Sequence, residues 1–229
     1  MNKRTFEPQN QIQFDTYDKK GGVILGPYSS HIYRSDPRHL SFLLARYKFI
    51  SKMLKGKKKV LEIGCGDSFG TALILQTVES VHAIDIEPLV IEDNLKRTAH
   101  EGWRCSYEVL DITSNIPKER FDGAFALDVI EHIPPEREEY FMKNIFSSLN
   151  EDAMLLIGTP NITAKQYASP ASAEGHINLK NENSLRNLMS KYFRNVFIFS
   201  MNDEVVHTGY SPMAHYLLGM GVSKINTTV

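Results

Sequence analysis

Residues 58–71, KKVLEIGCGDSFGT, decide the fold, because their chemistry changes from strand to loop to helix within one short stretch. The apolar run at 60–63 is typical of a strand that is buried on both faces. Gly64 and Gly66 then permit positive φ and remove the Cβ atoms that would keep a ligand from the backbone. Gly70 lets a following helix pack closely. The stretch predicts a strand, a ligand-binding turn and a helix, in that order.

Glu62 is the charged residue within this apolar run, and a buried carboxylate is costly unless it meets a hydrogen-bond donor. We therefore expect its side chain to face the carboxyl end of the sheet, where such a donor can be found. A glycine-rich turn by itself is weak evidence for a cofactor site. The residues that follow the other strands provide the further evidence on which ligand the turn binds.

The chain has 229 residues, of which 42% are hydrophobic, and this suits one domain with a full core and small additions. Residues 1–20 are polar, and no apolar run approaches the roughly 20 residues that a membrane span needs. We therefore expect no signal peptide, no membrane partner and a cytoplasmic location. Cys65 and Cys105 are too few for a disulfide framework or a zinc site, so we expect reduced, structural thiols.

The net charge of −1 conceals an uneven distribution. Residues 1–59 hold 13 Lys and Arg against 4 Asp and Glu, or +9, while the remainder carries −10. One interpretation is a solvated face together with the basic run at 55–59, where cations suit the carbonyl end of a helix. The other interpretation is that this basic extension meets an anionic substrate or surface.

Apolar residues recur at helical spacing between about residues 37 and 55, which predicts an amphipathic helix that covers the sheet. Residues 1–36, with their glycines and scattered aromatics, are expected to form an ordered or ligand-ordered cap. We place the domain boundary just before the first strand. This gives an N-terminal cap or lid at 1–56, which includes the amphipathic helix, and a main domain at 57–229.

Strands and helices alternate through the main domain. Strands are predicted at 60–63, 81–84, 105–110, 121–127, 154–158 and 196–201, with an extended segment at 204–208 beside the last of them. Helices are predicted at 71–77, 88–100, 134–149 and 183–192. This alternation specifies a Rossmann-like α/β fold, in which a mostly parallel, doubly wound sheet is covered by helices on both faces.

Polar residues follow three of the predicted strands, at the edge where such sheets bind ligands. Asp85 comes 19 residues after Gly66, a spacing at which an acidic side chain can accept both hydroxyls of a nucleoside ribose. Asp111 and Ile112 suit the amino group and ring face of adenine, and residues 127–132, LDVIEH, follow the fourth strand. Both carboxylates have structural alternatives, since Asp85 could cap the next helix and Asp111 could stabilise a turn.

The segments VLEIGCGDSFGT, AIDIEP, DIT, FDGAFALDVIEHIPPE and LLIGTPN, in this order and spacing, resemble those of the class I S-adenosylmethionine-dependent methyltransferases. The resemblance covers about residues 60–192. It is strongest to the small-molecule group that includes the ubiquinone-biosynthesis O-methyltransferases and many enzymes of natural-product and surface-glycan pathways. It implies a seven-stranded sheet whose last strand runs antiparallel, formed here by residues 204–208. Ser68 departs from the pattern, because the family more often has a third glycine there.

The resemblance implies that the cofactor is S-adenosylmethionine, with S-adenosylhomocysteine as the product. It also assigns cofactor-binding residues along the chain. These are Glu62 near the amino-acid end, Gly64, Cys65 and Gly66 under the methionine part, Asp85 at the ribose with Ile86 beside it, Asp111 and Ile112 at the adenine, and Leu127 and Asp128 nearest the methionine moiety.

Three other functions compete with that of a small-molecule methyltransferase. A nicotinamide dehydrogenase uses the same sheet, but G-x-G-x-x-G would need glycine where the chain has Phe69. A non-catalytic cofactor-binding or partner-binding domain stays open from the sequence. A nucleic-acid or protein methyltransferase is disfavoured because residues 127–130 do not form the Asn/Asp-Pro-Pro-aromatic motif of amino-directed DNA enzymes, and neither cysteine follows a proline. We therefore expect no nucleic-acid partner.

The methyl acceptor is expected to be a small, anionic metabolite that is methylated on oxygen, for example a phosphorylated compound or a sugar nucleotide. Tyr28, Arg34 and Arg38 of the cap are the candidate substrate-binding residues. His176 is the leading candidate for the general base, because neutral imidazole accepts protons near neutral pH, and His132 is the reserve. His176 follows a long polar insertion, residues 161–175, of the kind that usually serves function. The oligomeric state is left open.

Asp128, Glu131 and His132 form a D-x-x-E-H pattern that could direct two or three ligands at one hard cation. Some relatives in the ubiquinone pathway resemble the chain here and use a divalent ion. The alternative, which we favour, is that Glu131 and His132 cap and pack the loop after the fourth strand. The sequence therefore predicts no metal.

Overall fold

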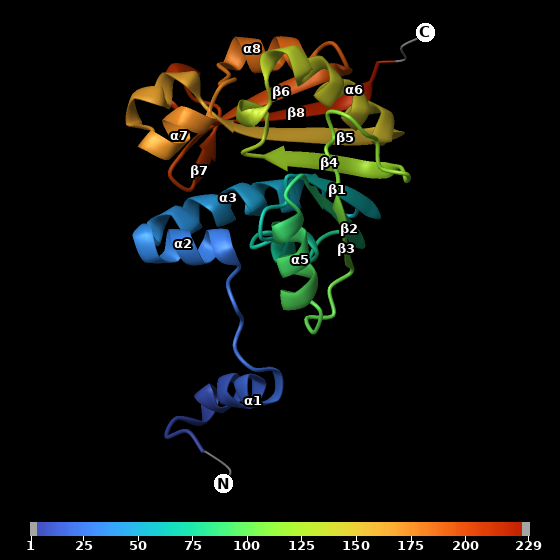
Figure 1. Ribbon diagram of the computed structural model, residues 1–229. Helices are drawn as coiled ribbons and strands as arrows, with labels where there is room; N and C mark the ends of the chain where they lie inside the picture. Colours follow the sequence, from blue (N-terminus) through green and yellow to red (C-terminus); the bar gives the residue numbers. More distant parts are fainter. Residues whose placement is uncertain (1–3, 226–229) are drawn as a thin grey trace.

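The computed structural model describes residues 4–225, so the first three residues of the expected cap and the last four of the main domain lie outside the described residues. Figure 1 shows one central sheet with helices on both of its faces. The strands are β1 (Lys59–Ile63), β2 (Ser80–Asp85), β3 (Cys105–Val109), β4 (Phe121–Leu127), β5 (Leu149–Pro160), β6 (Phe193–Asn202), β7 (Val205–His207) and β8 (Tyr216–Lys224).

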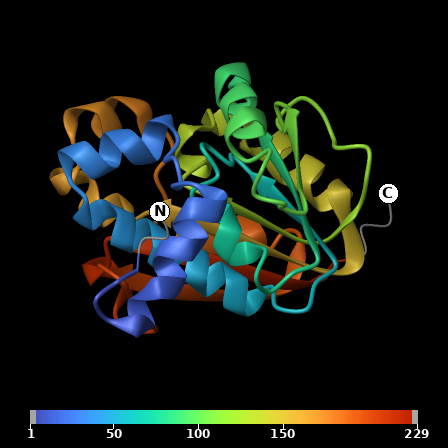
Figure 2. The same ribbon diagram turned by 90° about the horizontal axis from the view of Figure 1, so that it is seen from below.

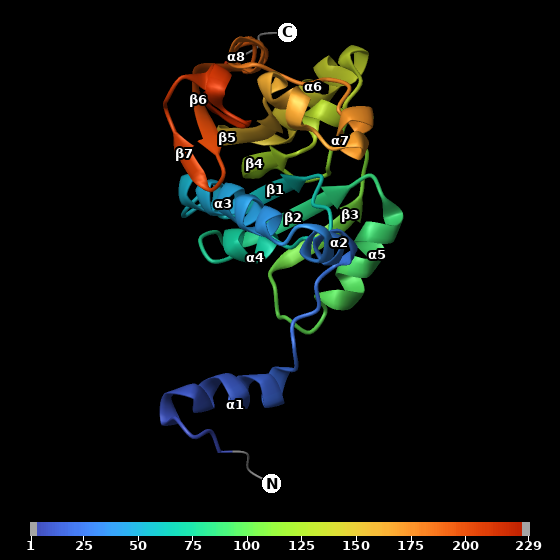
Figure 3. The ribbon, with the colours of Figure 1, turned by 90° about the vertical axis from the view of Figure 1, so that its left-hand side faces the viewer.

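The strands lie side by side in the order β3-β2-β1-β4-β5-β8-β6-β7. Strands β1 to β5 pair in parallel, and β8 runs antiparallel between β5 and β6. The prediction of a mostly parallel, doubly wound α/β sheet is therefore confirmed. The carboxyl ends of the parallel strands meet at one edge, which faces the viewer in Figure 3.

The antiparallel strand predicted at 204–208 is confirmed, but the sheet contains a second antiparallel strand that was not predicted. Residues 204–208 contain β7, which pairs antiparallel with β6 at the outer edge. The inserted strand is β8, which raises the strand count from the expected seven to eight and whose Gly219 and Gly221 hide it from a strand pattern. A Cβ on these glycines would lie 2.6 Å from Met189 Sδ and from Phe193 Cδ2 respectively. Glycine is needed there because side chains pack directly onto the backbone of the strand.

The helices are α1 (Gln11–Lys20), α2 (Pro27–Ser35), α3 (Arg38–Met53), α4 (Thr71–Ile74), α5 (Pro88–Arg97), α6 (Glu138–Ser148), α7 (Pro170–Gly175) and α8 (Glu182–Met189), with 3-10 turns η1 (Pro8–Asn10), η2 (Ile130–His132), η3 (Pro135–Arg137), η4 (Ile162–Tyr167) and η5 (Ser211–Met213). The predicted amphipathic helix is α3. The insertion at 161–175 is largely helical, because it contains η4 and α7.

The core has two parts, one on each face of the sheet. On one face, Leu61 and Ile157 of the sheet pack with Phe141 of α6 and Leu185 of α8. On the other face, the sheet packs against α3, α4 and α5, which contribute residues such as Ile50. Burial at this scale stabilises a fold by roughly 25 cal/mol for each Å² of apolar surface removed from water. None of the helices within residues 4–225 is long and apolar enough to span a membrane.

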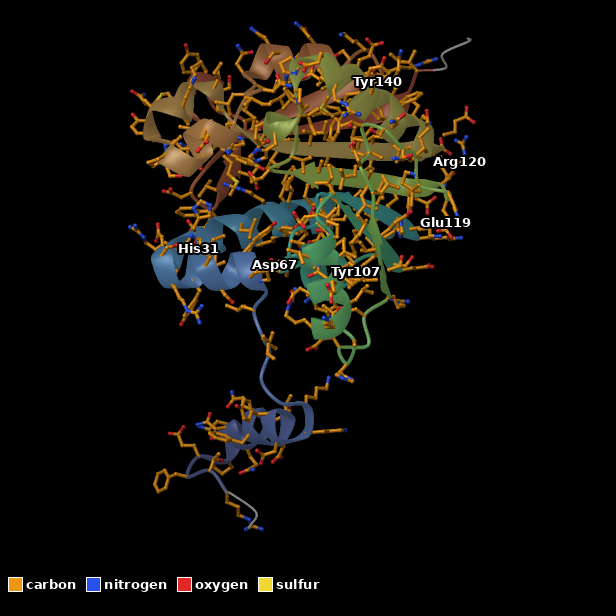
Figure 4. The ribbon with its side chains drawn as sticks, in the orientation of Figure 1. His31, Asp67, Tyr107, Glu119, Arg120 and Tyr140 are labelled. Atoms are coloured by element: carbon orange, nitrogen blue, oxygen red, sulfur yellow. The ribbon has the colours of Figure 1, made fainter. Side chains whose placement is uncertain are left out.

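The N-terminal segment has two parts. Figures 1 and 3 show α1 as a separate helix joined to the rest by an extended stretch at 21–26, whereas α2 lies against the sheet domain. In Figure 2, which is seen from below, α1 lies in front of that domain. The anchor of α2 is Asp67, labelled in Figure 4, whose Oδ2 accepts the Ser29 backbone N–H at 2.6 Å and whose Oδ1 accepts the Ser29 hydroxyl at 3.0 Å. Because Asp67 belongs to the turn after β1, this pair of bonds holds the cap directly on the predicted ligand-binding turn.

Candidate functional site

The turn after β1 has the backbone that its glycines predict. Gly64 and Gly66 have φ angles of 68° and 49°, in the left-handed region. A Cβ on Gly64 would lie 2.4 Å from Val129 Cγ2, and one on Gly66 would lie 3.3 Å from the Tyr28 ring. Ser68, at φ 55°, has a buried hydroxyl without a partner among the described residues. This turn has the shape of a cradle that brings backbone close to a ligand.

Glu62 lies beneath this turn. Its side chain is buried, its Oε1 accepts the Tyr47 hydroxyl at 2.8 Å, and its Oε2 accepts the Thr71 hydroxyl at 2.8 Å. Burial raises the pKa of Glu62 to about 7, although both hydrogen bonds act to lower it. The donors that the sequence required are therefore supplied by α3 and α4, and Glu62 ties these helices together under the turn. Its contact with a cofactor stays a prediction.

Cys65 is a packing residue of the turn. Burial raises the pKa of its thiol, so the reactive thiolate is suppressed. The carbonyl of the next residue, Gly66, accepts a hydrogen bond from Asn94 Nδ2 at 2.7 Å, which holds α5 against the turn. Both cysteines are free in the described residues.

Asp85 closes the turn from the end of β2. Its Oδ2 accepts the Gly66 N–H at 2.9 Å and its Oδ1 accepts the Glu87 N–H at 3.0 Å. The N-cap of α5 is Glu87, which accepts the Leu89 N–H, so Asp85 is not the cap of that helix. A carboxylate has about four lone-pair sites, which leaves capacity for two ribose hydroxyls. Ile86 beside it is exposed.

Asp111 holds the turn that follows β3. Its Oδ1 accepts the backbone N–H and the hydroxyl of Thr113, and its Oδ2 accepts the Ser114 hydroxyl. Burial raises the pKa of Asp111, but these hydrogen bonds outweigh burial and leave the pKa lowered. The structural alternative for Asp111, a turn-stabilising role, is therefore real. Its adenine contact stays a prediction, as does that of Ile112, which is buried in the core.

Asp128 follows β4 in a conformation that non-glycine residues rarely adopt, with φ at 56°. Its backbone N–H donates to the Gly158 carbonyl at 3.0 Å, and its Oδ2 accepts Arg46 Nη1 of α3 at 2.8 Å. Leu127 beside it is buried. The strain at Asp128 is tolerated because both its backbone and its side chain are fixed by neighbouring elements.

Buried polar atoms without partners lie around Asp128. Arg46 Cζ stacks 3.8 Å above the centre of the Tyr216 ring, which comes from the start of β8. Arg46 Nε and Glu131 Oε1 have no hydrogen-bond partner among the described residues. The other oxygen of Glu131 accepts the Thr159 hydroxyl at 3.0 Å. Burial, and next the charge of Asp128, raise the pKa of Glu131 to about 8.

His132 and His176 lie next to each other beside this group. Gly175, which precedes His176, bonds to His132 although the two residues are 43 positions apart in the chain. His132 Nδ1 lies 2.9 Å from the Gly175 carbonyl, and the two imidazole rings are 5.0 Å apart at their centres. Burial, and next the charge of His132, lower the pKa of His176. The structure thus brings together both of the histidines singled out by the sequence.

The possible cation ligands differ from the D-x-x-E-H set. Ligand atoms of Glu131, His132 and His176 lie within 4.8 Å of one another. Asp128 is instead paired with Arg46. The set of three residues is therefore different from the one in the sequence pattern, because His176 arrives from the segment after α7 and replaces Asp128.

The predicted acceptor residues lie on the cap. Tyr28 is half exposed, and its ring lies next to Gly66, close to the turn after β1. Burial, and next the charge of Asp85, raise the pKa of Tyr28. Arg34 is exposed on α2, and Arg38 is exposed and paired with Asp36 at 3.0 Å. Their contacts with an acceptor stay predictions.

A family model described as a methyltransferase domain matches residues 33–192. The chain belongs to this methyltransferase domain family. Together with the sheet order and the turn after β1, this match confirms the expected class I methyltransferase, an enzyme class that uses S-adenosylmethionine as methyl donor. No curated protein matches the chain in sequence.

Solved structures of other methyltransferases share the fold. The N-methyltransferase NodS from Bradyrhizobium japonicum WM9, in complex with S-adenosylhomocysteine, has 18% identity and a TM-score of 0.63, covering 91% of this chain and 98% of NodS. The methyltransferase domain of bacterial CtHen1-C has 19% identity and a TM-score of 0.65, covering 79% and 98%. A methyltransferase from Clostridium acetobutylicum has 11% identity and a TM-score of 0.67, covering 84% and 96%.

Two residues of this methyltransferase site gave too little signal in the sequence to be predicted. Arg46 interrupts the apolar stripe of α3, between Ala45 and Tyr47, and this interruption was the available signal. A charge on the buried face of a helix needs a partner, which is Asp128. Tyr216 gave no such signal, because the strand that carries it was not predicted.

Proposed function

We propose that this methyltransferase transfers a methyl group to an oxygen atom of a small, anionic metabolite, with His176 as general base. The observation that carries the proposal is the pairing of His176 with His132 beside Asp128, at the edge of the sheet where such folds bind their ligands. The structural neighbour NodS is an N-methyltransferase, so oxygen is proposed here from the site and not from the fold.

The residues of the turn fit the cofactor. Gly64 and Gly66 form the cradle, Asp85 retains lone pairs for ribose hydroxyls, and the buried hydroxyl of Ser68 has no partner in the described chain. We propose that these residues, with Asp111, Ile112 and Leu127, hold S-adenosylmethionine. The cofactor supplies a methyl group that its sulfonium charge already activates. The protein then has to align the acceptor, exclude water and take up a proton.

The proposed base is supported by the state of the two histidines. A carbonyl only accepts hydrogen bonds, so His132 places a proton on Nδ1 toward Gly175 and keeps the lone pair of Nε2 when it is neutral. The lowered pKa of His176 keeps that ring neutral at pH 7. His176 can therefore remove the hydroxyl proton of an acceptor as its oxygen bonds to the methyl carbon. His132 remains the alternative base.

The proposed anionic character rests on the charge of the N-terminal part of the chain, where residues 1–59 carry +9. Arg34 is exposed on α2, the helix that is anchored on the ligand-binding turn through Asp67. Arg38 follows at the start of α3. We propose that these cap residues attract a phosphate or carboxylate at the rim of the site.

A divalent cation is a second candidate for the same corner of the site. The convergence of Glu131, His132 and His176 and the partnerless Oε1 of Glu131 favour it. Carboxylate and imidazole suit ions such as Mn²⁺. In this alternative His176 would be a ligand and the cation would lower the pKa of the acceptor hydroxyl. A general base needs no metal, so only the cation candidate predicts that turnover depends on a divalent ion.

The proposed function is tested by incubating the protein with radiolabelled S-adenosylmethionine and a panel of sugar nucleotides and phosphorylated metabolites. We expect label to enter at least one anionic acceptor at a hydroxyl, as located by mass spectrometry of the product. A preferred acceptor that proved neutral would contradict the anionic class. Methylation at nitrogen would contradict the acceptor atom.

Repeating the active pair after exhaustive chelation distinguishes the base from the cation. The base account expects unchanged turnover in EDTA. Loss of turnover that Mn²⁺ or Mg²⁺ restores would instead assign Glu131, His132 and His176 to a cation.

A further inference from the structure

A cavity of about 500 Å³ lies outside the group of residues to which the proposed function gives a role. Ligand pockets in proteins usually measure about 300–1,000 Å³, so this cavity is large enough for a small molecule. It lies where the start of η4, the start of α8 and the loop after β7 meet. Most of its lining side chains are hydroxyls and carboxamides, which come from Thr163, Asn181, Asn183, Thr208, Tyr210 and Ser211.

The cavity lies at the same edge of the sheet as the candidate site. Pro160, which ends β5 just before the η4 wall, pairs with Tyr216 at the start of β8. Asn181 of the α8 wall is five positions after His176 in the chain. Five residues of extended chain span at most about 18 Å, so one extended acceptor can reach from the proposed base into the cavity.

The walls of the cavity are held together by Asn161, which is buried. Its Nδ2 donates to the Ser211 carbonyl at 2.8 Å and to the Ala214 carbonyl at 3.0 Å. The backbone N–H of the next residue, Ile162, donates to the Lys180 carbonyl at 2.8 Å. These bonds fix η4 to both other walls. A cavity that is fixed in advance has less entropy to lose when a ligand binds.

The loop after β7 is fixed by a histidine. His207 Nδ1 accepts the Gly209 N–H at 2.9 Å, and His207 Nε2 lies 2.9 Å from Asn202 Oδ1. Because Nδ1 accepts a hydrogen bond and the amide oxygen cannot donate one, the proton of the ring is on Nε2. The loop therefore presents Thr208 and Tyr210 to the cavity from a defined position.

Three of the lining side chains have no other task. Asn183, Thr208 and Tyr210 are exposed, and their side chains make no hydrogen bond to another described residue. Asn181, by contrast, accepts the Ser184 N–H in the capping box of α8. A carboxamide and a hydroxyl each donate and accept, as the hydroxyls of a sugar do. The Tyr210 ring adds an apolar face, which suits the C–H face of a sugar ring.

The charge of the lining argues against an anion in this cavity. None of the described residues that line it is Lys or Arg. Its carboxylate, Glu182, is paired with Arg186 at 3.0 Å. Hydrogen bonds, from Ser211 first and from Arg186 next, lower the pKa of Glu182, so this group is ionised at neutral pH. A phosphate would meet a negative charge here, whereas a neutral ligand would not.

We propose that this cavity binds a neutral, polyhydroxylated part of the methyl acceptor, such as a sugar ring, with Tyr210 stacked on the ring and Asn183 and Thr208 bonded to its hydroxyls. The inference rests on the proposed function for its setting. It leaves the anionic group of the acceptor with the cap, so the acceptor combines a sugar with a phosphate or a carboxylate.

Saturation-transfer NMR on the full chain tests the cavity without cofactor and without methyl transfer. The probes are the methyl α-D-pyranosides of glucose, galactose, mannose and N-acetylglucosamine. Glycerol, a polyol without a ring, is the control for unspecific contacts. We expect saturation to reach the ring protons of at least one pyranoside and not to reach glycerol.

Matched variants connect this binding to the cavity. Tyr210→Ala should abolish the signal, and Asn183→Ala should weaken the affinity by about 2–10-fold, the usual contribution of one neutral hydrogen bond. Asn187→Ala removes the same side chain one turn later on α8, outside the lining, and should leave binding intact. Thermal melts identify a variant that fails to fold. If Tyr210→Ala does, the double variant Asn183→Ala with Tyr210→Phe carries the comparison.

Kinetics with the acceptor that is active in the panel connect the cavity to the reaction. Tyr210→Ala should raise the KM for that acceptor by about tenfold or more while kcat changes by less than about twofold, because the ring binds a part of the acceptor that does not react. The affinity for S-adenosylhomocysteine should stay the same.

The outcomes separate this proposal from the proposed function. A wild type that binds none of the pyranosides, binding that survives in Tyr210→Ala, or an unchanged KM overturns the proposal. A panel in which no acceptor is methylated would count against the proposed function instead, while the NMR experiment would still decide whether the cavity binds a sugar.

Discussion

His176→Ala is expected to lower the turnover number by about 10²–10⁴-fold, the usual contribution of a general base, while the affinity for S-adenosylhomocysteine stays nearly unchanged. The reason is that His176 lies across from His132, on the segment after α7, and does not belong to the turn after β1. Turnover of the wild type should rise with pH through the pKa of His176 and level off above it. Because that pKa is lowered, the rise should lie below about pH 6.5.

His100→Ala is the matched control for this variant. His100 is exposed and lies between α5 and β3, at the opposite end of the sheet from the candidate site. It should retain full turnover. Near-normal turnover in His176→Ala would rule out the base assignment. His132→Ala is a second test of the same assignment. The charge of His132 lowers the pKa of His176, so its removal should move the rise of turnover to slightly higher pH.

Asp85→Ala is expected to weaken cofactor binding by roughly 10²–10⁴-fold. Two hydrogen bonds from ribose hydroxyls to a carboxylate are worth about 1.5–3 kcal/mol each. The same change removes the acceptor of the Gly66 N–H at 2.9 Å, so the turn loses a brace as well. Titration calorimetry with S-adenosylhomocysteine measures the loss directly.

Two further variants keep the Asp85 result interpretable. Asp85→Asn preserves the volume of the side chain and one acceptor oxygen, so its loss of affinity should be smaller than that of Asp85→Ala. Asp152→Ala removes an exposed carboxylate of β5 near its amino-terminal end and should bind the cofactor normally. Equal affinity in Asp85→Ala and the wild type would show that the ribose is held elsewhere.

The sequence predicted the central sheet well because its signals are local. The apolar run at 60–63 and the glycines after it specify strand and turn without reference to distant residues. The strand β8 could not be predicted in this way. Its glycines at 219 and 221 are explained only by Met189 and Phe193, which pack onto the strand from elsewhere in the chain.

In the candidate site, too, features with a local sequence signal were predicted and features that depend on distant residues were not. Asp85 was found because its distance from Gly66 is a feature of the sequence, and the structure places it at that turn. Glu62 was expected to meet a hydrogen-bond donor at the carboxyl end of the sheet, and Tyr47 and Thr71 supply two donors beneath the turn. Which side chains satisfy a buried carboxylate depends on packing between α3 and α4, and a linear pattern does not contain that information.

The set of possible cation ligands also differs between the sequence pattern and the structure, because it depends on residues that are distant in the chain. The D-x-x-E-H pattern groups residues that are close in sequence, and so it proposed Asp128 as a ligand. The fold pairs Asp128 with Arg46 of α3 and brings in His176. The partner of Asp128 lies 82 residues away along the chain, beyond the reach of any local motif.

The most direct measurement is a calorimetric titration of the wild-type protein with S-adenosylhomocysteine and, separately, with NAD. The turn, the ribose carboxylate and the family match together predict saturable heat with S-adenosylhomocysteine and none with NAD. Heat with NAD and none with S-adenosylhomocysteine would contradict the account, because the same sheet and carboxylate would then serve a nicotinamide cofactor.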